Sequence, residues 1–381
     1  LGILGWDEAV LGDVEGGIAR FREALAIAEE LGSFAGIALG YSNLAGLLDR
    51  IGRVEEALAA AREGFAIARR GGLERTYGGE MLGHAAKALL DLGRWDEADA
   101  LTDEALERAP TGPTAIWLLV NRARLETRRG QFDDAAEHLA TARAIDESLG
   151  GTERRPALLS ALAELAAWQR RIDDVRATVI EGIARASEMG LPDPALAWLA
   201  AMVLRAEADA AERARARRDE VGLARARAAV DEVMRQVERF GGDGLESAAA
   251  LTGPRGVAVA ALCRAELARL EGRPSPPSWA EAARAWDAIG RPFTPAYARF
   301  REAEALLAAR GERADAARAL SAAWATCVAL GAAPLRADGA LVARRAATCA
   351  WTALPLRVAM GIFRLTAGRG ARAPRQRRGW R

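Results

Sequence analysis

The sequence repeats with a period of about 40 residues, and this spacing limits the folds open to the chain. Each copy has a glycine, a bulky apolar or aromatic residue two positions later and an acidic residue next. The clear copies begin 40, 41, 37 and 40 residues apart, at Gly12, Gly52, Gly93, Gly130 and, in degraded form, Arg170. A weaker copy begins at Gly311. A fixed period of this size indicates one structural unit that stacks on its neighbours.

Each copy has the pattern of two helices joined by a tight turn. Apolar residues at helical spacing, such as Leu44 and Leu47, precede the glycine. Glycine ends a helix because it adopts positive φ without steric cost, and the acidic residues favour the N-terminus of the next helix. In "LGRWDEADAL", we therefore expect Trp95 to fill a buried slot. Asp96 and Glu97 are expected to begin a helix rather than to form a catalytic pair.

Small residues recur where paired helices must touch, at Ala45, Ala86, Ala123, Ala57, Ala98 and Ala135. This pattern resembles the tetratricopeptide repeat, which alternates small and aromatic residues across a helix pair. Phe21 and Pro110 also stand where that repeat favours a large residue and a closing proline. The period exceeds the usual ~34 residues, so the copies are degenerate. The sequence predicts an all-α fold, a right-handed superhelical solenoid of antiparallel helix pairs.

Three regions are expected along the chain. Residues 1–190 form helix-pair repeats, and residues 191–345 continue them with longer helices and a proline-rich break at 272–278. Whether 195–240 holds one helix or two stays open. Residues 346–381 are rich in arginine and are predicted to form a basic, disordered tail.

The composition suits closely packed helices, with 51% hydrophobic residues but only 6% aromatic ones.

Cys263, Cys327 and Cys349 are too scattered for a disulfide framework, which favours a cytoplasmic location. No apolar run reaches 18 residues and no basic leader precedes one, so neither a membrane span nor a signal peptide is predicted. The alternately charged stretch 211–230 is expected to be a solvated surface.

Charge is distributed unevenly between the body and the tail. From Arg336 onward there are 11 arginines and one acidic residue, a net charge of +10, whereas residues 1–335 carry −9. An acidic body is not typical of a nucleic-acid-binding surface. The tail is interpreted as a disordered segment or the product of a frameshift near Arg345, with a basic arm that binds nucleic acid as the alternative.

The sequence predicts no catalytic, cofactor-binding or metal-ligating residue, no cofactor and no enzymatic activity. The only lysine, Lys87, follows alanine, whereas a phosphate-binding P-loop needs glycine before its lysine. No Gly-x-Ser-x-Gly motif is present. His84 and His138 are 54 residues apart; we expect His84 to pack or lie at the surface and His138 to face outward. Cys327 is expected to act as a small buried hydrophobe.

Over about residues 1–346, the chain resembles the helical-repeat region of large ATP-binding LuxR-type transcriptional regulators of actinobacteria. The resemblance depends on the order of three segments, "GLERTYG", "WDAIGRPF" and "ALGAAPL". It implies an ATP-binding domain before Leu1 and a DNA-binding helix-turn-helix after "LVARRA", both missing from this sequence. The chain would then be the sensor fragment of such a regulator.

A solenoid exposes a long concave groove, so the expected partner is a protein, a peptide or a small inducer. DNA and ATP would be bound only through the missing domains, and no membrane partner is expected. Two alternatives stay open: a stand-alone helical scaffold, and the helical arm of another ATP-dependent signalling protein. The sequence leaves the ligand, the groove contacts and the oligomeric state undetermined.

Overall fold

The computed structural model describes residues 2–10, 12–189, 194–241 and 253–348, and every regular element in these ranges is a helix. The first ten α-helices follow the repeats: α1 (Gly2–Val10), α2 (Val14–Glu30), α3 (Phe34–Arg50), α4 (Val54–Arg70), α5 (Gly79–Asp91), α6 (Trp95–Glu107), α7 (Gly112–Arg129), α8 (Phe132–Ser148), α9 (Arg155–Trp168) and α10 (Ile172–Met189). A short π-helix, η1 (Glu74–Gly78), leads directly into α5.

The later helices are more varied in length: α11 (Pro194–Arg217), α12 (Glu220–Gly241), α14 (Gly253–Leu270), α15 (Pro276–Asp287), α16 (Phe293–Ala308), α17 (Arg313–Leu330) and α18 (Ala333–Thr348). The region 195–240 thus contains two helices, which settles the question that the sequence left open. None of the helices in the described ranges combines the length and the apolar character needed to cross a membrane.

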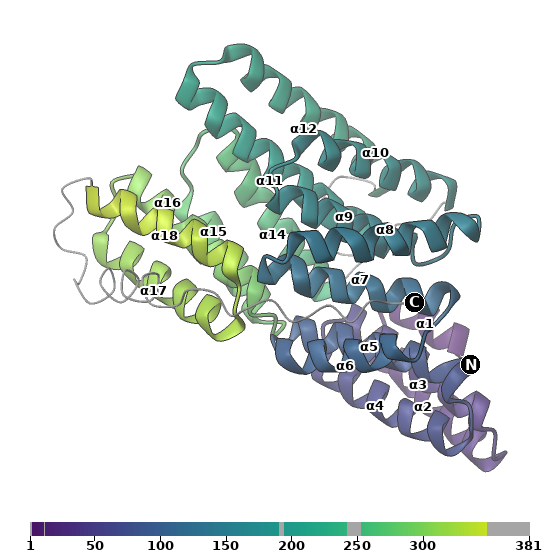
Figure 1. Ribbon diagram of the computed structural model, residues 1–381. Coiled ribbons are helices and arrows are strands. Elements are labelled where there is room, and N and C mark those ends of the chain that lie inside the picture. Colours follow the sequence, from purple (N-terminus) through teal and green to yellow (C-terminus); the bar gives the residue numbers. More distant parts are fainter. Residues whose placement is uncertain (1, 11, 190–193, 242–252, 349–381) are drawn as a thin grey trace.

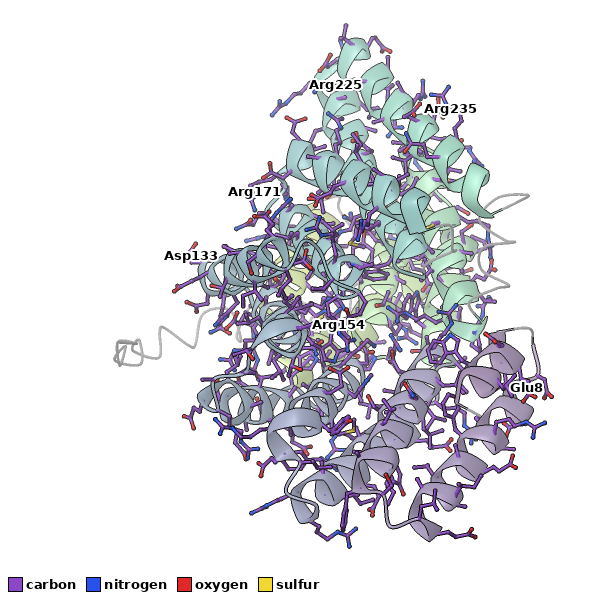
Figure 2. The ribbon with its side chains drawn as sticks, turned by 90° about the vertical axis from the view of Figure 1, so that its right-hand side faces the viewer. Glu8, Asp133, Arg154, Arg171, Arg225 and Arg235 are labelled. Atoms are coloured by element: carbon purple, nitrogen blue, oxygen red, sulfur yellow. The ribbon has the colours of Figure 1, made fainter. Side chains whose placement is uncertain are left out.

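The helices stack as pairs into a solenoid, as predicted. One helix of each pair lies inside and packs on the corresponding helix of the next pair, so that α5, α7, α9, α11 and α14 form a continuous inner row. Figure 1 shows the stack rising from α1–α4 at the lower right to α10–α12 at the top, with α15–α18 as a separate block on the left. In Figure 2, exposed charged side chains such as Asp133, Arg171 and Arg225 point outward from the carbon-rich interior.

The repeated glycine ends the inner helix of each pair, as expected. Gly52, Gly93 and Gly130 have φ values of +87°, +77° and +85°, in the left-handed region that favours glycine. The backbone N–H of Gly130 donates to Thr127 O at 3.1 Å, and the next N–H, of Gln131, donates to Glu126 O at 2.8 Å. These bonds satisfy carbonyls at the end of the helix and reverse the chain within three residues.

Trp95 is the buried side chain that the repeat predicted. It is 2% exposed, and its indole Nε1 donates to the backbone oxygen of Leu90 at 3.0 Å, so it ties α6 to the end of α5. Asp96 and Glu97 lie in the first turn of α6, also as predicted. The small residues that were expected at helix contacts are all buried: Ala45, Ala57, Ala86, Ala98, Ala123 and Ala135.

Two weaker copies of the repeat differ from the glycine rule. In the copy at Arg170 the arginine itself adopts φ +59°, because the fold needs a left-handed residue there even without glycine. In the copy at Gly311 the left-handed residue is Arg310, with φ +54°, one position earlier than expected.

The proline-rich segment 272–278 was expected to be a break, and the connection from α14 to α15 falls there: α14 ends at Leu270 and the last three residues of the segment belong to α15. α15 begins at Pro276, so that Pro276 and Pro277 occupy its first turn, where the missing N–H groups cost nothing. Near the predicted tail, α18 continues to Thr348. The rest of the tail, 349–381, and the predicted boundary at 190–191 lie outside the described residues.

The C-terminal helices return to the turns of the first repeats. We call the turns at Gly52, Gly93, Gly130 and Arg170, each between the two helices of a pair, the turn row. A methyl group added at Gly93 would lie 2.7 Å from Pro292 Cγ and 2.8 Å from Leu330 Cδ2.

Similar contacts join the neighbouring turns to the same C-terminal block. Ile289 approaches Gly52, and Pro334 approaches Gly130. The connections α15–α16 and α17–α18 therefore lie across the turn row and close the array onto itself.

Candidate ligand-binding pocket

A cavity of about 650 Å³ lies between α11, α14, α15, α16 and α18, beside the α9–α10 turn. This volume is within the range of ligand-binding pockets. Residues from all these elements line it: Arg170, Asp209, Glu212, Arg213, Arg215, Ala216, Arg269, Gly272, Arg273, Pro274, Trp279, Tyr297, Phe300, Arg301, Glu304, Ala305, Leu307, Ala308, Leu335, Asp338, Leu341 and Val342.

One wall of the pocket is cationic. It consists of Arg213 and Arg215 at the end of α11 and of Arg273 in the α14–α15 turn. The Arg215 guanidinium donates to the backbone oxygens of Leu270 and Arg269, the latter at 3.4 Å, and so caps the end of α14. Burial, and to a smaller extent the nearby Arg227, lowers the pKa of Arg215 from its ordinary value.

A glycine allows this wall to form. Gly272 has φ +73°, and a methyl group placed there would lie 2.9 Å from Arg215 Nε. The absence of a side chain lets the guanidinium lie flat against the α14–α15 turn. Any other residue at this position would displace Arg215 and adopt a strained backbone.

The floor of the pocket is a buried network of ion pairs. Arg269 donates to Asp209 at 2.6 Å and to Glu266 at 2.8 Å, and Arg301 donates to Asp209 at 3.0 Å and to Glu304 at 2.7 Å. Although burial disfavours its charged form, Arg269 and Arg301 hold the pKa of Asp209 well below its ordinary value. The floor thus contains charged groups of both signs that neutralise one another, and their hydrogen bonds make it rigid.

The opposite wall is apolar. Phe300 of α16 packs against Gly339 of α18, where an added methyl group would overlap the ring. Leu335, Leu341 and Val342 continue this wall along α18, and Leu341 is 41% exposed. The wall can therefore accept an apolar side chain from a ligand.

An aromatic pair and an ion pair complete the lining. The rings of Trp279 and Tyr297 meet edge to face with their centroids 6.0 Å apart. At the edge of the pocket, Arg170 lies 3.5 Å from Asp338 and joins the last turn of the turn row to α18.

The chemistry that this pocket offers is binding. Arginine side chains remain protonated and donate up to five hydrogen bonds each, which suits recognition of carboxylates. Among the described residues, no group of three or more His, Cys, Asp or Glu side chains is placed to hold a metal ion.

The two histidines and Cys327 do not line this pocket. His84 packs edge to face on Trp117, with ring centroids 6.1 Å apart, in agreement with a packing role. Cys327 is fully buried, as expected. The prediction for His138 is wrong: its side chain is 31% exposed, and its Nδ1 lies 2.8 Å from a buried Glu126 oxygen, because α8 turns this face toward α7.

Sequence reasoning missed Arg213 and Arg215, which belong to the stretch predicted to be a solvated surface. Both side chains are only partly exposed and line the cavity. No local signal distinguishes them, because 52 of the 53 basic residues in this chain are arginines. Only the return of α14–α18 beside α11 makes them part of a pocket.

Comparisons with known proteins agree with the repeat architecture. Residues 79–148, which span α5 to α8, match the family model of the tetratricopeptide repeat. The chain is also similar in structure to a Rap protein that was crystallised in complex with competence and sporulation factor. That similarity has a TM-score of 0.53 at 13% sequence identity and covers 87% of this chain and 98% of the Rap chain.

These comparisons establish a tetratricopeptide-type repeat region over residues 79–148 and agree with the solenoid fold of the chain. At 13% sequence identity, the similarity to the Rap structure is evidence for the fold alone. No curated protein has a matching sequence. Neither comparison points to LuxR-type regulators or to actinobacteria, so that part of the sequence interpretation stays a prediction.

Proposed function

We propose that this chain is a protein-interaction module that holds a segment of a partner protein in the pocket between α11, α14–α16 and α18. The observation that carries the proposal is the cavity of about 650 Å³, with one cationic and one apolar wall. Pockets of this size with a few placed polar groups are typical ligand sites. Helical-repeat proteins commonly use such surfaces for peptide segments.

The Rap protein supports this proposal by analogy. It shares the fold over most of both chains and was crystallised with competence and sporulation factor bound. Combined with the resemblance to LuxR-type regulators, this favours a regulatory role in which the module senses its ligand for other domains. Ligand binding would act by favouring one arrangement of the helical array over another.

The test is a selection from a random heptapeptide library displayed on phage, with a matched pair of variants. Leu341→Arg places a charge on the apolar wall, whereas Val328→Arg places one on α17, outside the pocket; these side chains are 41% and 43% exposed in the protein. We expect peptides that bind the wild type to bind Val328→Arg equally and Leu341→Arg about tenfold more weakly or worse. Selected peptides that ignore Leu341→Arg would refute the proposal.

The regulatory role needs a separate test. The coding DNA around this chain is read in all frames for a P-loop motif upstream and a helix-turn-helix downstream. Their presence would support a sensor within a transcriptional regulator, and their absence would leave a helical interaction module.

A further inference from the structure

We propose that the partner segment is acidic: a carboxylate binds Arg213, and a neighbouring bulky apolar side chain packs on Phe300, Leu341 and Val342. This inference deepens the proposed function and rests on it. It follows from the charges and the shape of the pocket, which differ between the two walls.

The carboxylates that line the pocket are all paired with arginines, which leaves none of them free to oppose a bound anion. Six arginines and four acidic residues contribute to the lining. The acidic ones, Asp209, Glu212, Glu304 and Asp338, are all engaged by arginines of the same pocket, namely Arg269, Arg301 and Arg170.

Two of the lining arginines, both on the cationic wall, have no carboxylate partner among the described residues. Arg273 pairs with Glu271, outside the cavity. Within the part of the chain that the structure describes, Arg213 and Arg215 have no carboxylate at ion-pairing distance. The Arg215 guanidinium donates hydrogen bonds to backbone carbonyls at the end of α14. Arg213 makes no hydrogen bond to a described residue.

Arg213 is therefore the group that can bind an anion directly. It is partly buried, so a carboxylate there is screened less by water than on an open surface. A guanidinium matches a carboxylate with two parallel hydrogen bonds. Arg215 strengthens the same positive field without having to touch the ligand.

The apolar wall determines which kind of ligand side chain can lie next to the bound carboxylate. Phe300 is buried and held by its contact with Gly339, and Leu341 is partly open to solvent. An aliphatic or aromatic side chain that covers Leu341, which is 41% exposed, removes its apolar surface from water. The two walls together fit a segment in which acidic and bulky apolar residues alternate closely.

A protein segment fits better than a nucleic acid. Four carboxylates in the lining, among them Glu212 at 46% side-chain exposure, would repel a chain of phosphates. Residues 1–335 as a whole carry −9. A short peptide can direct its carboxylate to Arg213 alone, whereas a nucleic acid presents charge along its full length.

The experiment uses three fluorescein-labelled hexapeptides, Ser-Ser-X-Leu-Phe-Ser with an amidated C-terminus, in which X is Glu, Gln or Lys. Fluorescence polarisation measures their binding to the wild type, Arg213→Glu, Arg213→Gln and the control Arg225→Glu, which makes the same charge change on exposed α12 (Figure 2). Circular dichroism and urea unfolding verify that each variant is folded.

We expect the Glu peptide to bind the wild type and Arg225→Glu equally, Arg213→Gln about tenfold more weakly and Arg213→Glu more weakly still. Salt should weaken this binding, and the Lys peptide should prefer Arg213→Glu. Equal binding of the Glu, Gln and Lys peptides to the wild type would overturn the inference. So would competition at the pocket by single-stranded DNA.

The library selection separates the two possible failures. If it yields peptides that depend on Leu341 while the Glu peptide does not bind, the segment is not acidic and the proposed function stands. If the library yields no peptide that depends on Leu341, the proposed function fails and this inference fails with it.

Discussion

Arg291 and Asp49 are 242 positions apart in the sequence, and Arg291 Nη2 lies 3.1 Å from Asp49 Oδ1. Arg291 Nη1 also lies 3.0 Å from Asp91 Oδ2, and Lys87 Nζ donates to both carboxylates at 2.7 Å. These four side chains keep between 6% and 17% of their surface exposed. The only lysine of the chain thus belongs to a buried ion cluster that joins α3 and α5 to the α15–α16 connection.

We expect Arg291→Met to lower the free energy of unfolding by about 3–5 kcal/mol, because among the described residues it leaves only Lys87 at ion-pairing distance from the two buried carboxylates. Arg299→Met is the control: Arg299 pairs with Asp287 nearer the surface, at 27% and 43% side-chain exposure, and its loss should cost less than about 1 kcal/mol. Urea denaturation of both variants measures the difference. Similar losses in the two variants would contradict a role for the cluster in closing the array.

A pair of glycine variants tests the contact at Gly93. Gly72 has φ +69°, and a methyl group added there would have no atom within 4 Å, so Gly72→Ala introduces backbone strain alone, about 1–2 kcal/mol. Gly93→Ala adds the clash with Pro292 and Leu330, and we expect it to cost about 1–3 kcal/mol more. Both are measured as changes in the free energy of unfolding. Equal costs would mean that the C-terminal connections do not press on the turn row.

Stability should fall on mild acidification because of His84. Burial lowers the pKa of this imidazole from 6.5 to about 4, so the folded state holds it neutral. The unfolded chain takes up the proton first as pH falls, so this contribution is complete above pH 6.5 and is lost between 6.5 and 4. The loss amounts to about 3 kcal/mol.

The test compares the free energy of unfolding at pH 7 and pH 4.5 in two variants. His84→Gln should flatten the decrease, whereas His138→Gln, which removes the other histidine, should retain it. A decrease that persists unchanged in His84→Gln would assign it to other groups.

The two described cysteines should be inert in the native protein. Burial raises the pKa of both the Cys263 and the Cys327 thiols to about 12, so almost no thiolate is present at neutral pH. In a Cys349→Ser variant, Ellman's reagent should react with neither thiol before denaturation and with both after it. Rapid reaction of the folded variant would show that α14 or α17 opens easily.

The sequence predicted the structural features that depend on residues close together in the chain. The glycine turn, the slot of Trp95 and the acidic helix starts all arise from residues within one repeat. It could not predict that Arg291 reaches Asp49 or that Arg213 lines a cavity, because both depend on where the array returns in space. Arg213 also differs from the other arginines in nothing but its neighbours.

The segments behind the family resemblance have a clear structural place. "WDAIGRPF" and "ALGAAPL" contain Ile289, Arg291, Pro292, Leu330 and Pro334, which form the contacts with the turn row and the ion cluster. The resemblance depended on the order of these segments in the chain, and only the fold shows which residues they contact.

The contacts at the turn row limit the gain or loss of repeats in this array. In an open solenoid each repeat touches only its neighbours, so copies can be gained or lost at little cost to the rest. Here Ile289, Pro292 and Pro334 must meet glycines in three successive early turns. Removing or adding one helix pair between them would shift every one of these contacts at once. The contacts between the C-terminal connections and the early turns therefore fix the number of repeats in this molecule.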